Sequence, residues 1–569
     1  MRIQIIQDTI DKIRKKDIRK EKEVDTIFYV IKALKEYGIK NIIASPGMQN
    51  ASFNFMAQKD SFFNCISVVD ERSAAYVATG LSFESNEPTV ITCTGATASR
   101  NYFPGMTEAY YRKIPIVALT FHNTAANEYN LEPQFIDRSV SSNDVKAVHV
   151  KLPDTSFKSN ISECIVKLHV ALMTAKYLMQ PVHIDCPSAF TFENDEISNT
   201  LPISRVGYFN ENLNINLLKN DMKGKKIAIY IGSKVHDSDN LENAISQFAI
   251  NYKCPVFCDH TSNYHGKNKV LISQAVAMSN LIERPDIVID IGQVSGSYDS
   301  NRIFEKSCIW RVSSSQKIKM RFSKPLKYYF NCTEFFFFDA FNKGEILETN
   351  DYNSIVQDKI NKLSFPDLPL SNILVCQHLS TLLPKNCSLN VSILNSLRSL
   401  NFFKIDESIK VNCNVGGFGM DGAVSSFIGM SLSNTKKKYF GLFGDLAFFY
   451  DMNILGNRDI SSNIRIIVIN NGTGEEFHLI KEIESTIGEC ETNRLIAAGG
   501  HNKNGIKAWA ECNNFIYDSI SIKEELYEKL KFFCQADTSS PMLLEVKVSN
   551  IDEIQALQLI TTHNNYVGS

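Results

Sequence analysis

The chain has 569 residues, which is too many for one hydrophobic core, and a typical domain size of about 100–200 residues predicts several domains. Hydrophobic residues make up 44% of the chain and charged residues 21%, and the formal net charge is −2. This composition is typical of a soluble globular protein, and without a basic excess it favours small-molecule partners over nucleic acid or membranes.

The fourteen cysteines are scattered singly along the chain, without the paired spacings of a disulfide framework. This pattern is typical of a protein in a reducing compartment, so we expect a cytoplasmic location. The N-terminal segment MRIQIIQDTIDKIRKK mixes charged residues with isolated apolar ones, which is not the pattern of a secretory signal. The sequence also has no run of eighteen uncharged apolar residues, so no membrane span is predicted.

Short apolar segments recur in the first third of the chain, with helical stretches between them. They are NIIASPG (41–47), CISVV (65–69), PTVITCT (88–94), PIVALTF (115–121) and PVHIDCP (181–187). Strands that are apolar on both faces and separated by helices predict parallel βαβ units. We therefore expect an α/β domain at residues 1–196, followed by a polar linker at 197–223.

The same alternation occurs twice more. Residues 224–341 contain the apolar segments KKIAIYIG, PVFCDH, DIVIDIG and IWRVS, and the charged, proline-containing stretch 342–370 is expected to be a second linker. Residues 371–569 contain SLNVS, KVNCN, YFGLFGD, IRIIVINN and MLLEVKV. The sequence therefore predicts an α/β protein with three doubly wound domains and mainly parallel sheets.

Polar residues follow two of the apolar segments in the third domain. YFGLFGD ends in Gly444 and Asp445, and IRIIVINN ends in Asn470 and Asn471. Ligands bind beyond the carboxyl ends of parallel strands, and carboxylate and amide oxygens suit Mg²⁺. Asp445, Asn471 and the backbone carbonyl of Thr473 would leave coordination positions for a diphosphate. The alternative is that Gly-Asp only opens a turn and Asn-Asn only caps a helix.

The spacing GDx(24)NN resembles the diphosphate and metal motif of thiamine diphosphate enzymes, and the domain order resembles their pyrimidine-binding, central and diphosphate-binding domains. Within that superfamily, the chain looks most like the 2-succinyl-5-enolpyruvyl-6-hydroxy-3-cyclohexene-1-carboxylate synthase family of menaquinone biosynthesis. The similar segments are SPGMQNAS, VVDERSAAYVATGLS, TCTGATAS, FPGMTEAYYRKIPIVALT and GDLAFFYDMN. The resemblance spans nearly the whole chain and implies thiamine diphosphate and Mg²⁺ as cofactors.

The resemblance also implies roles for single residues. Glu71 matches the glutamate that hydrogen-bonds N1′ of the cofactor's aminopyrimidine and so promotes proton removal from C2. Met420 matches the large aliphatic residue that holds the cofactor bent. The alternatives are an exposed acid in the first turn of a helix and a core methionine. The cofactor-binding residues that the resemblance implies are Glu71, Ser392, Gly419, Met420, Gly444, Asp445, Asn471 and Phe477.

Glu71 and Asp445 fall in different predicted domains, although the cofactor must contact both. In this superfamily the two residues belong to different subunits. The resemblance therefore implies a homodimer or a tetramer of dimers.

Four positions depart from the synthase family, which uses arginines there to bind carboxylates. They hold Gln49, Asn123, Ser396 and Val415. Each lost charge-assisted contact costs about 1.5–3 kcal/mol of binding free energy. The negative charges of a substrate with two carboxylates would therefore be poorly neutralised by this site. Two basic residues remain as substrate-binding candidates. Arg398 lies two residues after Ser396, and Arg302 lies in the predicted central domain.

Three further polar residues are candidates for catalysis. Gln134 matches a glutamine that the family places near the cofactor, and His122 precedes one of the lost arginines. Glu476 stands where the family has an aliphatic residue, and it could transfer a proton or bind a hydroxyl or amine. The alternative for His122 and Glu476 is a solvated surface position.

We therefore expect a lyase or transferase that decarboxylates a 2-oxo acid and passes the resulting carbanion to a carbonyl or activated-alkene acceptor. Three alternatives stay open: a simple 2-oxo acid decarboxylase, a genuine synthase of the menaquinone pathway, and a catalytically silent paralogue that binds the cofactor. A dinucleotide-binding enzyme is not favoured, because no G-x-G-x-x-G follows a strand with an acidic residue about twenty positions later.

Overall fold

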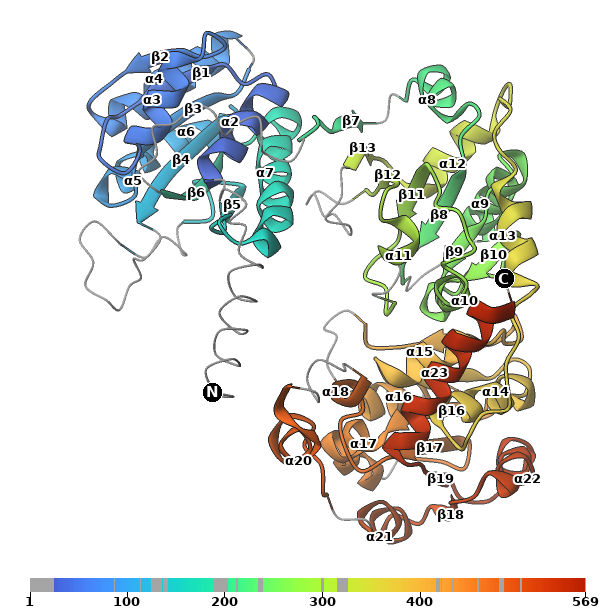
Figure 1. Ribbon diagram of the computed structural model, residues 1–569. Coiled ribbons are helices and arrows are strands. Elements are labelled where there is room, and N and C mark those ends of the chain that lie inside the picture. The colour runs from blue at the N-terminus through green and yellow to red at the C-terminus, as the bar shows by residue number, and fades with distance from the viewer. Residues whose placement is uncertain are drawn as a thin grey trace, which may run out of the picture. The chain divides into compact units, whose positions relative to one another are not determined.

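The computed structural model describes most of the chain from residue 25 to residue 567. The described residues are 25–85, 87–112, 114–123, 136, 142–188, 203–210, 213–233, 239–297, 301–314, 326–415, 420, 422–431, 434–457, 460–479, 486–501 and 504–567. The chain divides into two compact units (Figure 1). Unit 1 comprises Met1–Asn210 and Ser315–Asn331, and unit 2 comprises Glu211–Ser314 and Cys332–Ser569.

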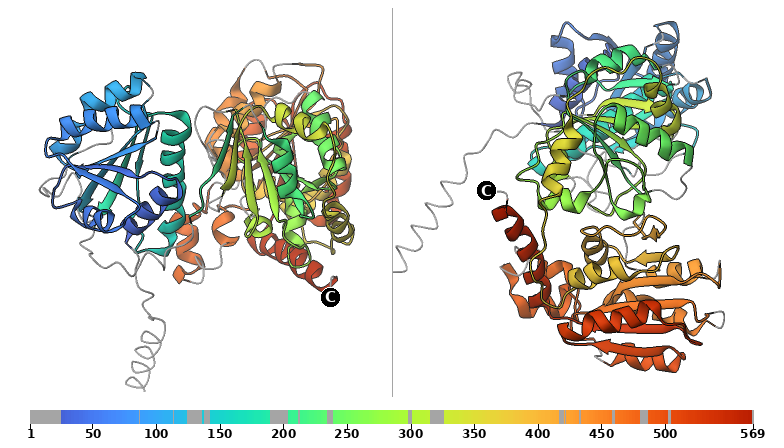
Figure 2. Two further views of the ribbon diagram at one scale, coloured as in Figure 1. Left: turned by 90° about the horizontal axis from the view of Figure 1, so that it is seen from above. Right: turned by 90° about the vertical axis from the view of Figure 1, so that its right-hand side faces the viewer.

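Unit 1 contains a six-stranded sheet with helices on both of its faces (Figure 2). Its helices are α2 (Thr26–Glu36), α3 (Ala51–Lys59), α4 (Glu71–Ser85), α5 (Thr97–Asn101), α6 (Phe103–Arg112) and α7 (Lys158–Leu178). Its strands are β1 (Asn41–Ala44), β2 (Asn64–Ser67), β3 (Thr89–Thr94), β4 (Ile116–Asn123), β5 (Val148–Lys151) and β6 (Val182–Ser188). A further parallel pair joins β7 (Gly207–Asn210) to β13 (Leu326–Asn331).

The six strands of this sheet pair in parallel in the order β2-β1-β3-β4-β6-β5. The neighbouring strands β4 and β6 bury nearly all of their residues, as expected for strands covered by helices on both faces. The edge strand β2 is instead exposed along its whole length within the chain. The carboxyl ends of β1 to β4 meet at one edge, where the chain leads into α4.

The first part of unit 2 contains five parallel strands in the order β10-β9-β8-β11-β12. The strands are β8 (Ile227–Ile231), β9 (Val256–Cys258), β10 (Lys269–Leu271), β11 (Ile287–Ile291) and β12 (Cys308–Val312). The helices are α8 (Ile215–Met222), α9 (Asp239–Asn251), η2 (His260–Ser262), α10 (Ile272–Ala277), α11 (Asn301–Phe304), α12 (Glu334–Asn342) and α13 (Tyr352–Ile360).

The second part of unit 2 contains a six-stranded parallel sheet. Its strands are β14 (Ser388–Val391), β15 (Lys410–Asn412), β16 (Tyr439–Gly444), β17 (Ile464–Asn470), β18 (Ile516–Ile520) and β19 (Met542–Lys547). Its helices are α14 (Asn372–Leu382), α15 (Asn395–Leu400), α16 (Ala423–Ser431), α17 (Asp445–Asp451), η4 (Met452–Gly456), α18 (Glu476–Leu479), α20 (Glu489–Glu491), the π-helical turn η5 (Thr492–Ile496), α21 (Gly505–Cys512), α22 (Lys523–Gln535) and α23 (Asn550–Val567).

The strand order of this sheet is β15-β14-β16-β17-β19-β18. Numbered along the chain, it is 2-1-3-4-6-5, the same order as in the sheet of unit 1. The order reverses between β14 and β16, and ligands of open α/β sheets bind beyond the carboxyl ends of strands at such a switch point. The fold therefore indicates that a site lies at the carboxyl edge of each of these two sheets.

The two parts of unit 2 are joined by buried polar contacts. The backbone N–H of His260 donates to Asn401 Oδ1 at 3.0 Å, and His260 Nε2 lies 2.9 Å from the carbonyl oxygen of Phe403. Burial lowers the pKa of His260 to about 3, so this imidazole is neutral at physiological pH. Asn263 and Val411 exchange two further hydrogen bonds of 2.9 Å each.

The predicted fold class is confirmed, since each sheet has only parallel pairs among its described strands and is packed with helices. Two of the strands that the sequence did not predict, β5 and β18, lie at sheet edges. The stretches expected to be linkers contain β7, α8 and α13. No helix in the described ranges is both long enough and apolar enough to cross a membrane.

Candidate functional site

Three candidate residues follow neighbouring strands at the switch point of the sheet in the second part of unit 2. Ser392 follows β14, Asp445 follows β16 and Asn471 follows β17. Gly444 pairs in register with Ile469, so β16 and β17 end at nearly the same level. The strands bury almost all of their side chains, which leaves these polar residues at the sheet edge. The structure therefore brings together residues that are distant in sequence.

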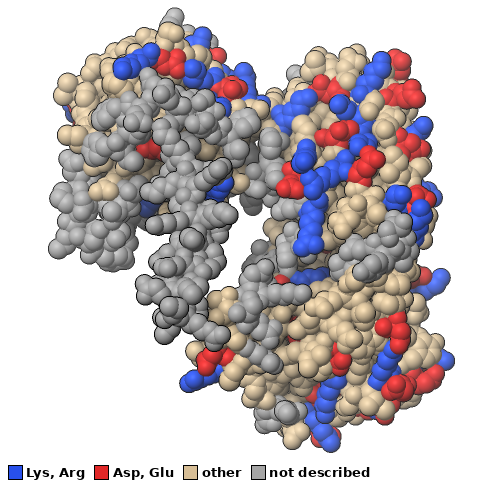
Figure 3. Space-filling model, viewed as in Figure 1, with Lys and Arg blue, Asp and Glu red and all other residues tan. Residues whose placement is uncertain are grey.

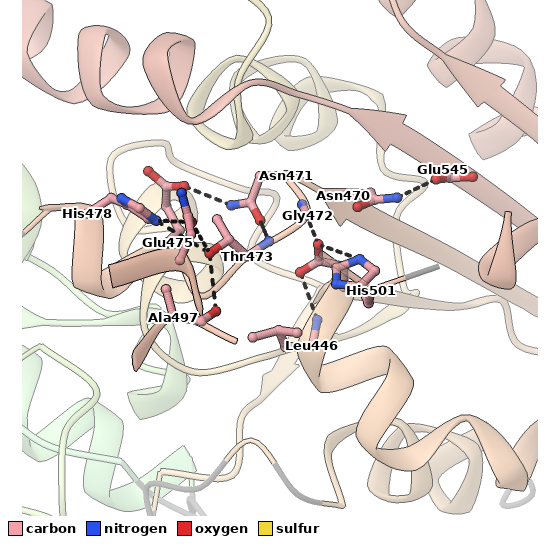
Figure 4. A network of polar contacts seen from close by, with 12 residues as sticks. Leu446, Asn470, Asn471, Gly472, Thr473, Glu475, His478, Ala497, His501 and Glu545 are labelled. Atoms are coloured by element: carbon pink, nitrogen blue, oxygen red, sulfur yellow. Dashed lines mark hydrogen bonds and ion pairs between the residues drawn. The ribbon is translucent and has the colours of Figure 1, made fainter. Parts of the chain in front are cut away.

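Asp445 is buried, and three groups hold its carboxylate. Oδ1 accepts from the backbone N–H of Leu446 at 2.7 Å, and Oδ2 accepts from the N–H of Gly472 at 2.7 Å (Figure 4). Oδ2 also lies 3.3 Å from Nε2 of His501, whose ring packs on Phe449 with a centroid separation of 4.6 Å. The contact with Gly472 ties the end of β16 to the turn after β17.

The turn after β17 is shaped by its first glycine. Gly472 has a φ of +81°, a backbone conformation that favours glycine over other residues. Asn471 Nδ2 donates to Glu475 Oε2 at 3.0 Å, and Asn471 Oδ1 accepts from the backbone N–H of Thr473 at 3.2 Å (Figure 4). The Thr473 hydroxyl lies 3.1 Å from the carbonyl oxygen of Ala497, which closes the turn against η5. The orientation of the Asn471 amide is thus fixed by its neighbours.

A second row of polar contacts supports this turn from β19. Asn470 Nδ2 donates to Glu545 Oε1 at 2.6 Å, and the hydroxyl of Tyr517 donates to Glu545 Oε2 at 2.5 Å. Glu545 is fully buried, so its carboxylate depends on these two donors. The pairing fixes Asn470 and therefore the position at which Asn471 leaves the strand.

A cavity with about 800 Å³ of empty space, including its open mouth, lies over these strand ends. Met420 and Phe477 line it and are 39% and 37% exposed, so Met420 is not a buried core methionine. Ser392 is buried, and its Oγ accepts from the N–H of Gly444 at 3.3 Å. The residues that line the cavity are Asn372, Ser392, Ile393, Leu394, Asn395, Ser396, Met420, Gly444, Asp445, Leu446, Ala447, Ile469, Asn471, Thr473, Gly474, Glu475, Glu476, Phe477, Ile496, Ala497 and Ala498.

The oxygen donors of the cavity fit a magnesium diphosphate. Asp445 offers a carboxylate and Asn471 an amide oxygen, and both line the same cavity. Mg²⁺ prefers oxygen ligands, uses one or two carboxylates, and usually takes its remaining ligands from phosphate and water. The chemistry of these residues therefore suits the cofactor that the sequence predicts.

Four positions considered for substrate binding lie in unit 2, and their surroundings differ. Ser396 is buried, and its Oγ accepts from Asn372 Nδ2 at 3.3 Å. Arg398 forms an ion pair with Glu476, with Nη2 at 2.8 Å from Oε1 and 2.9 Å from Oε2. Arg302 is exposed on α11 and is not among the residues that line the cavity. Val415, at the fourth lost arginine position, is buried.

Glu71 is the first residue of α4, at the carboxyl edge of the sheet in unit 1. Its Oε2 accepts from Asn101 Nδ2 at 3.1 Å. Asn101 ends α5 after β3, a contact that the sequence did not indicate. Gln49 lies in the turn after β1 at the same edge, and Asn50 orders that turn by accepting from the N–H of Gly47 at 2.9 Å. Glu71 and Gln49 thus share one edge of unit 1.

His122 lies near the end of β4 and is buried, so it is not a solvated surface residue. Its Nδ1 is 3.2 Å from Oδ1 of Asp185 on the neighbouring strand β6, and the Thr120 hydroxyl donates to the same oxygen at 3.1 Å. Asn123, the last residue of β4, is only partly buried. Asp185 was missed in the sequence, where it looked like one more residue of the apolar segment PVHIDCP. Gln134 and Gly419 lie outside the described residues.

A buried acid lies behind the cavity and was also missed. Glu553, on α23, accepts from the backbone N–H of Asn372 at 2.7 Å and from Asn395 Nδ2 at 3.3 Å. Burial raises the pKa of Glu553 to about 7, although both hydrogen bonds act in the opposite direction. Asn372 and Asn395 line the cavity, so this acid supports the cavity wall from behind.

The raised pKa of Glu553 predicts a pH-dependent stability. Because the folded chain binds this proton more tightly than the unfolded chain, the free energy of unfolding falls as pH rises from 4.5 to about 7. Glu553→Gln removes the titration and keeps a hydrogen-bond acceptor. We expect the variant to gain up to about 3 kcal/mol relative to the parent at pH 8, and almost nothing near pH 4.5. Denaturant unfolding between pH 5 and pH 8 checks this, and a pH-independent difference would contradict it.

Comparisons with known proteins agree with this geometry. Residues 25–142 match the model of the thiamine pyrophosphate enzyme N-terminal TPP binding domain. Proteins named 2-succinyl-5-enolpyruvyl-6-hydroxy-3-cyclohexene-1-carboxylate synthase are similar over 91% of the chain. Those from Bacteroides fragilis, Phocaeicola vulgatus and Flavobacterium psychrophilum are 26%, 27% and 28% identical, with 95%, 95% and 94% of their own lengths covered. The resemblance predicted from the sequence is thereby confirmed: the N-terminal part of the chain matches the thiamine pyrophosphate enzyme domain, and the chain is similar along most of its length to these synthases.

Proposed function

We propose that the chain is a thiamine diphosphate- and Mg²⁺-dependent enzyme that decarboxylates a 2-oxo acid and transfers the remaining carbon fragment to an acceptor. The observation that carries this proposal is the oxygen clamp, Asp445 and Asn471, at the switch point of the sheet and inside the cavity. The relationship to thiamine pyrophosphate enzymes supports the cofactor, and the synthase relatives support the combination of decarboxylation and transfer.

Each part of the cavity has a proposed role. Asp445, Asn471 and the backbone of Thr473 hold Mg²⁺, and Ser392 and Gly444 bind the diphosphate end. Gly419 is a further proposed cofactor-binding residue. Met420 and Phe477 contact the ring system of the cofactor. Thiamine diphosphate, when bound, supplies the electron sink that loss of CO₂ requires.

Residues of unit 1 have proposed roles toward a cofactor that is bound by unit 2 of a different subunit. Glu71 holds and moves a proton at the aminopyrimidine, and the Asn101 contact orients its carboxylate. His122 and Gln134 are proposed to face the reacting carbon. The buried Asp185 supports this role for His122, because its contact at Nδ1 fixes the orientation of the imidazole.

A homodimer, or a tetramer of dimers, is the proposed assembly. Several apolar side chains of unit 1 are exposed in the single chain: Val69 is 81% exposed, and Met48, Ile66 and Val77 are exposed as well. Apolar surface of this kind marks an interaction site in many proteins. Around unit 2, Figure 3 shows acidic and basic residues mixed on the visible face, which fits small-molecule partners.

The donor is proposed to differ from that of the relatives. At four positions where the synthase family uses arginines to bind carboxylates, this chain has uncharged residues. They are Gln49, Asn123, Ser396 and Val415. The proposed acceptor is a carbonyl compound or an activated alkene.

Measuring CO₂ release from a panel of 2-oxo acids, with thiamine diphosphate and Mg²⁺ added, tests the proposed function. Turnover of at least one acid is expected, and trapping the product with an aldehyde separates transfer from simple decarboxylation. The synthase family acts on 2-oxoglutarate and isochorismate, so ordinary turnover of this pair would refute the argument from the missing arginines and identify a genuine synthase. Cofactor binding without consumption of any acid would identify a silent paralogue.

A further inference from the structure

An ion pair begins at the cavity wall in unit 2: Glu476 lines the cavity, whereas its partner Arg398 is not among the lining residues. It joins Arg398, on α15, to Glu476, the first residue of α18. The side chains are 16% and 21% exposed, so solvent screens the pair only in part. Both carboxylate oxygens of Glu476 lie within 2.9 Å of one guanidinium nitrogen. Glu476 therefore takes the place on Arg398 that a substrate carboxylate would take.

The remaining charge in the cavity wall has the same sign as a substrate carboxylate. The described residues that line the cavity include the acids Asp445, Glu475 and Glu476 and no lysine or arginine. Asp445 is the proposed Mg²⁺ ligand and Glu476 is the partner of Arg398, so Glu475 is the acid that adds further negative charge to the wall. Like charges repel one another more strongly in a partly enclosed cavity than in bulk water, because the effective dielectric constant is lower there. A second carboxylate on the substrate would thus be repelled here while Arg398 is already paired.

Another part of the cavity wall is apolar. Met420 and Phe477 line the same cavity, and each leaves more than a third of its surface accessible. An aliphatic side chain of a substrate would bury the part of this apolar surface that the cofactor rings leave accessible, and burial of apolar surface is favourable. The cavity therefore offers apolar contact to a substrate, while Arg398 is already paired with Glu476.

We propose that the Arg398–Glu476 pair selects the donor acid: the site takes a monocarboxylic 2-oxo acid with an uncharged side chain and rejects a dicarboxylic one. The inference rests on the proposed function and narrows its substrate class. Glu476 acts as a built-in competitor for Arg398, and its effect is on specificity rather than on the chemical step.

Glu476→Gln tests the inference, because glutamine has nearly the same size and no charge. The ratio of kcat/KM for 2-oxoglutarate to kcat/KM for 2-oxobutyrate is expected to rise at least about tenfold, since Arg398 becomes able to bind the second carboxylate. Arg398→Gln is expected to leave the ratio unchanged or to lower it. Equal losses with both acids in both variants would mean that the pair is only structural, and would overturn the inference.

Glu525→Gln is the matched control. Its carboxylate also pairs with a basic residue, Lys529, at 3.3 Å, but on the exposed face of α22. This control is expected to leave the ratio within twofold of the parent.

A binding measurement separates this inference from the proposed function. Calorimetry with thiamine diphosphate and Mg²⁺ present compares glutarate with butyrate, which need no turnover. In Glu476→Gln, glutarate is expected to bind at least about tenfold more tightly and butyrate to be unchanged; equal changes would refute the inference. If the parent consumes no 2-oxo acid, the proposed function fails while this comparison still decides the inference. Should Glu476→Gln not fold, Glu476→Ser removes the same charge and takes its place.

Discussion

Glu71→Gln is expected to slow deuterium exchange at C2 of bound thiamine diphosphate by about 10²–10⁴-fold, the range that general acid–base catalysis supplies. Glutamine retains the shape of the side chain and the hydrogen-bond acceptor for Asn101, which contacts Glu71 at 3.1 Å. It cannot exchange a proton with the aminopyrimidine. Because the clamp in unit 2 is unchanged, cofactor affinity is expected to change much less than the exchange rate. NMR of quenched samples measures the exchange without any need to know the substrate.

Asp70→Asn is the control for this experiment. Asp70 immediately precedes Glu71 and accepts from the backbone N–H of Arg72 at 3.2 Å, so its role is local to the start of α4. Exchange in this variant is expected to stay within about threefold of the parent, whereas a loss as large as that of Glu71→Gln would be a general effect of disturbing α4. If Glu71→Gln exchanged at the parent's rate, Glu71 would not be the activating residue.

Asp445→Asn is expected to weaken binding of thiamine diphosphate at a fixed Mg²⁺ concentration by about 10–150-fold. This range corresponds to the loss of one charge-assisted contact, about 1.5–3 kcal/mol. The asparagine keeps an oxygen that can accept from Gly472 N, so the turn after β17 is expected to persist. Calorimetric titration of the cofactor at several Mg²⁺ concentrations measures the effect, and the deficit should shrink as Mg²⁺ increases.

Asp451→Asn is the matched control for the clamp. Asp451 ends the same helix, α17, and is buried, but it is not among the residues lining the cavity. Cofactor affinity of this variant is expected to match the parent. Equal weakening in both variants would indicate that α17 had been disturbed, and unchanged affinity in Asp445→Asn would remove Asp445 from the metal site.

The buried strands were predictable because their sequences are apolar on both faces. The segments PIVALTF and IRIIVINN correspond to β4 and β17, and Asp445 and Asn471 follow the carboxyl ends of the neighbouring strands β16 and β17, as expected. The physical reason is that a strand covered by helices on both sides is mostly apolar along its length, so polar residues directly after its end stand out in the sequence. The edge strands β5 and β18 lack this signal, because part of each is exposed.

The partners of the candidate residues were not predictable. Arg398 pairs with Glu476, and His122 with Asp185, across large separations in the sequence. Only the strand order and the turns bring these side chains together, so neither propensity nor apolar periodicity contains the information. Leu394, which lines the cavity with a φ of +63°, is a similar case, since leucine rarely adopts this conformation and tertiary contacts must impose it.

A structure of the protein with thiamine diphosphate and Mg²⁺ tests the central claim most directly. We predict that, within one assembly, a Glu71 carboxylate oxygen lies about 2.6–3.2 Å from N1′ of a cofactor. We predict that the Mg²⁺ of this same cofactor is bound by Asp445 and Asn471 at about 2.0–2.1 Å. A bound cofactor that touches only one of these two regions in every subunit pairing would contradict the account.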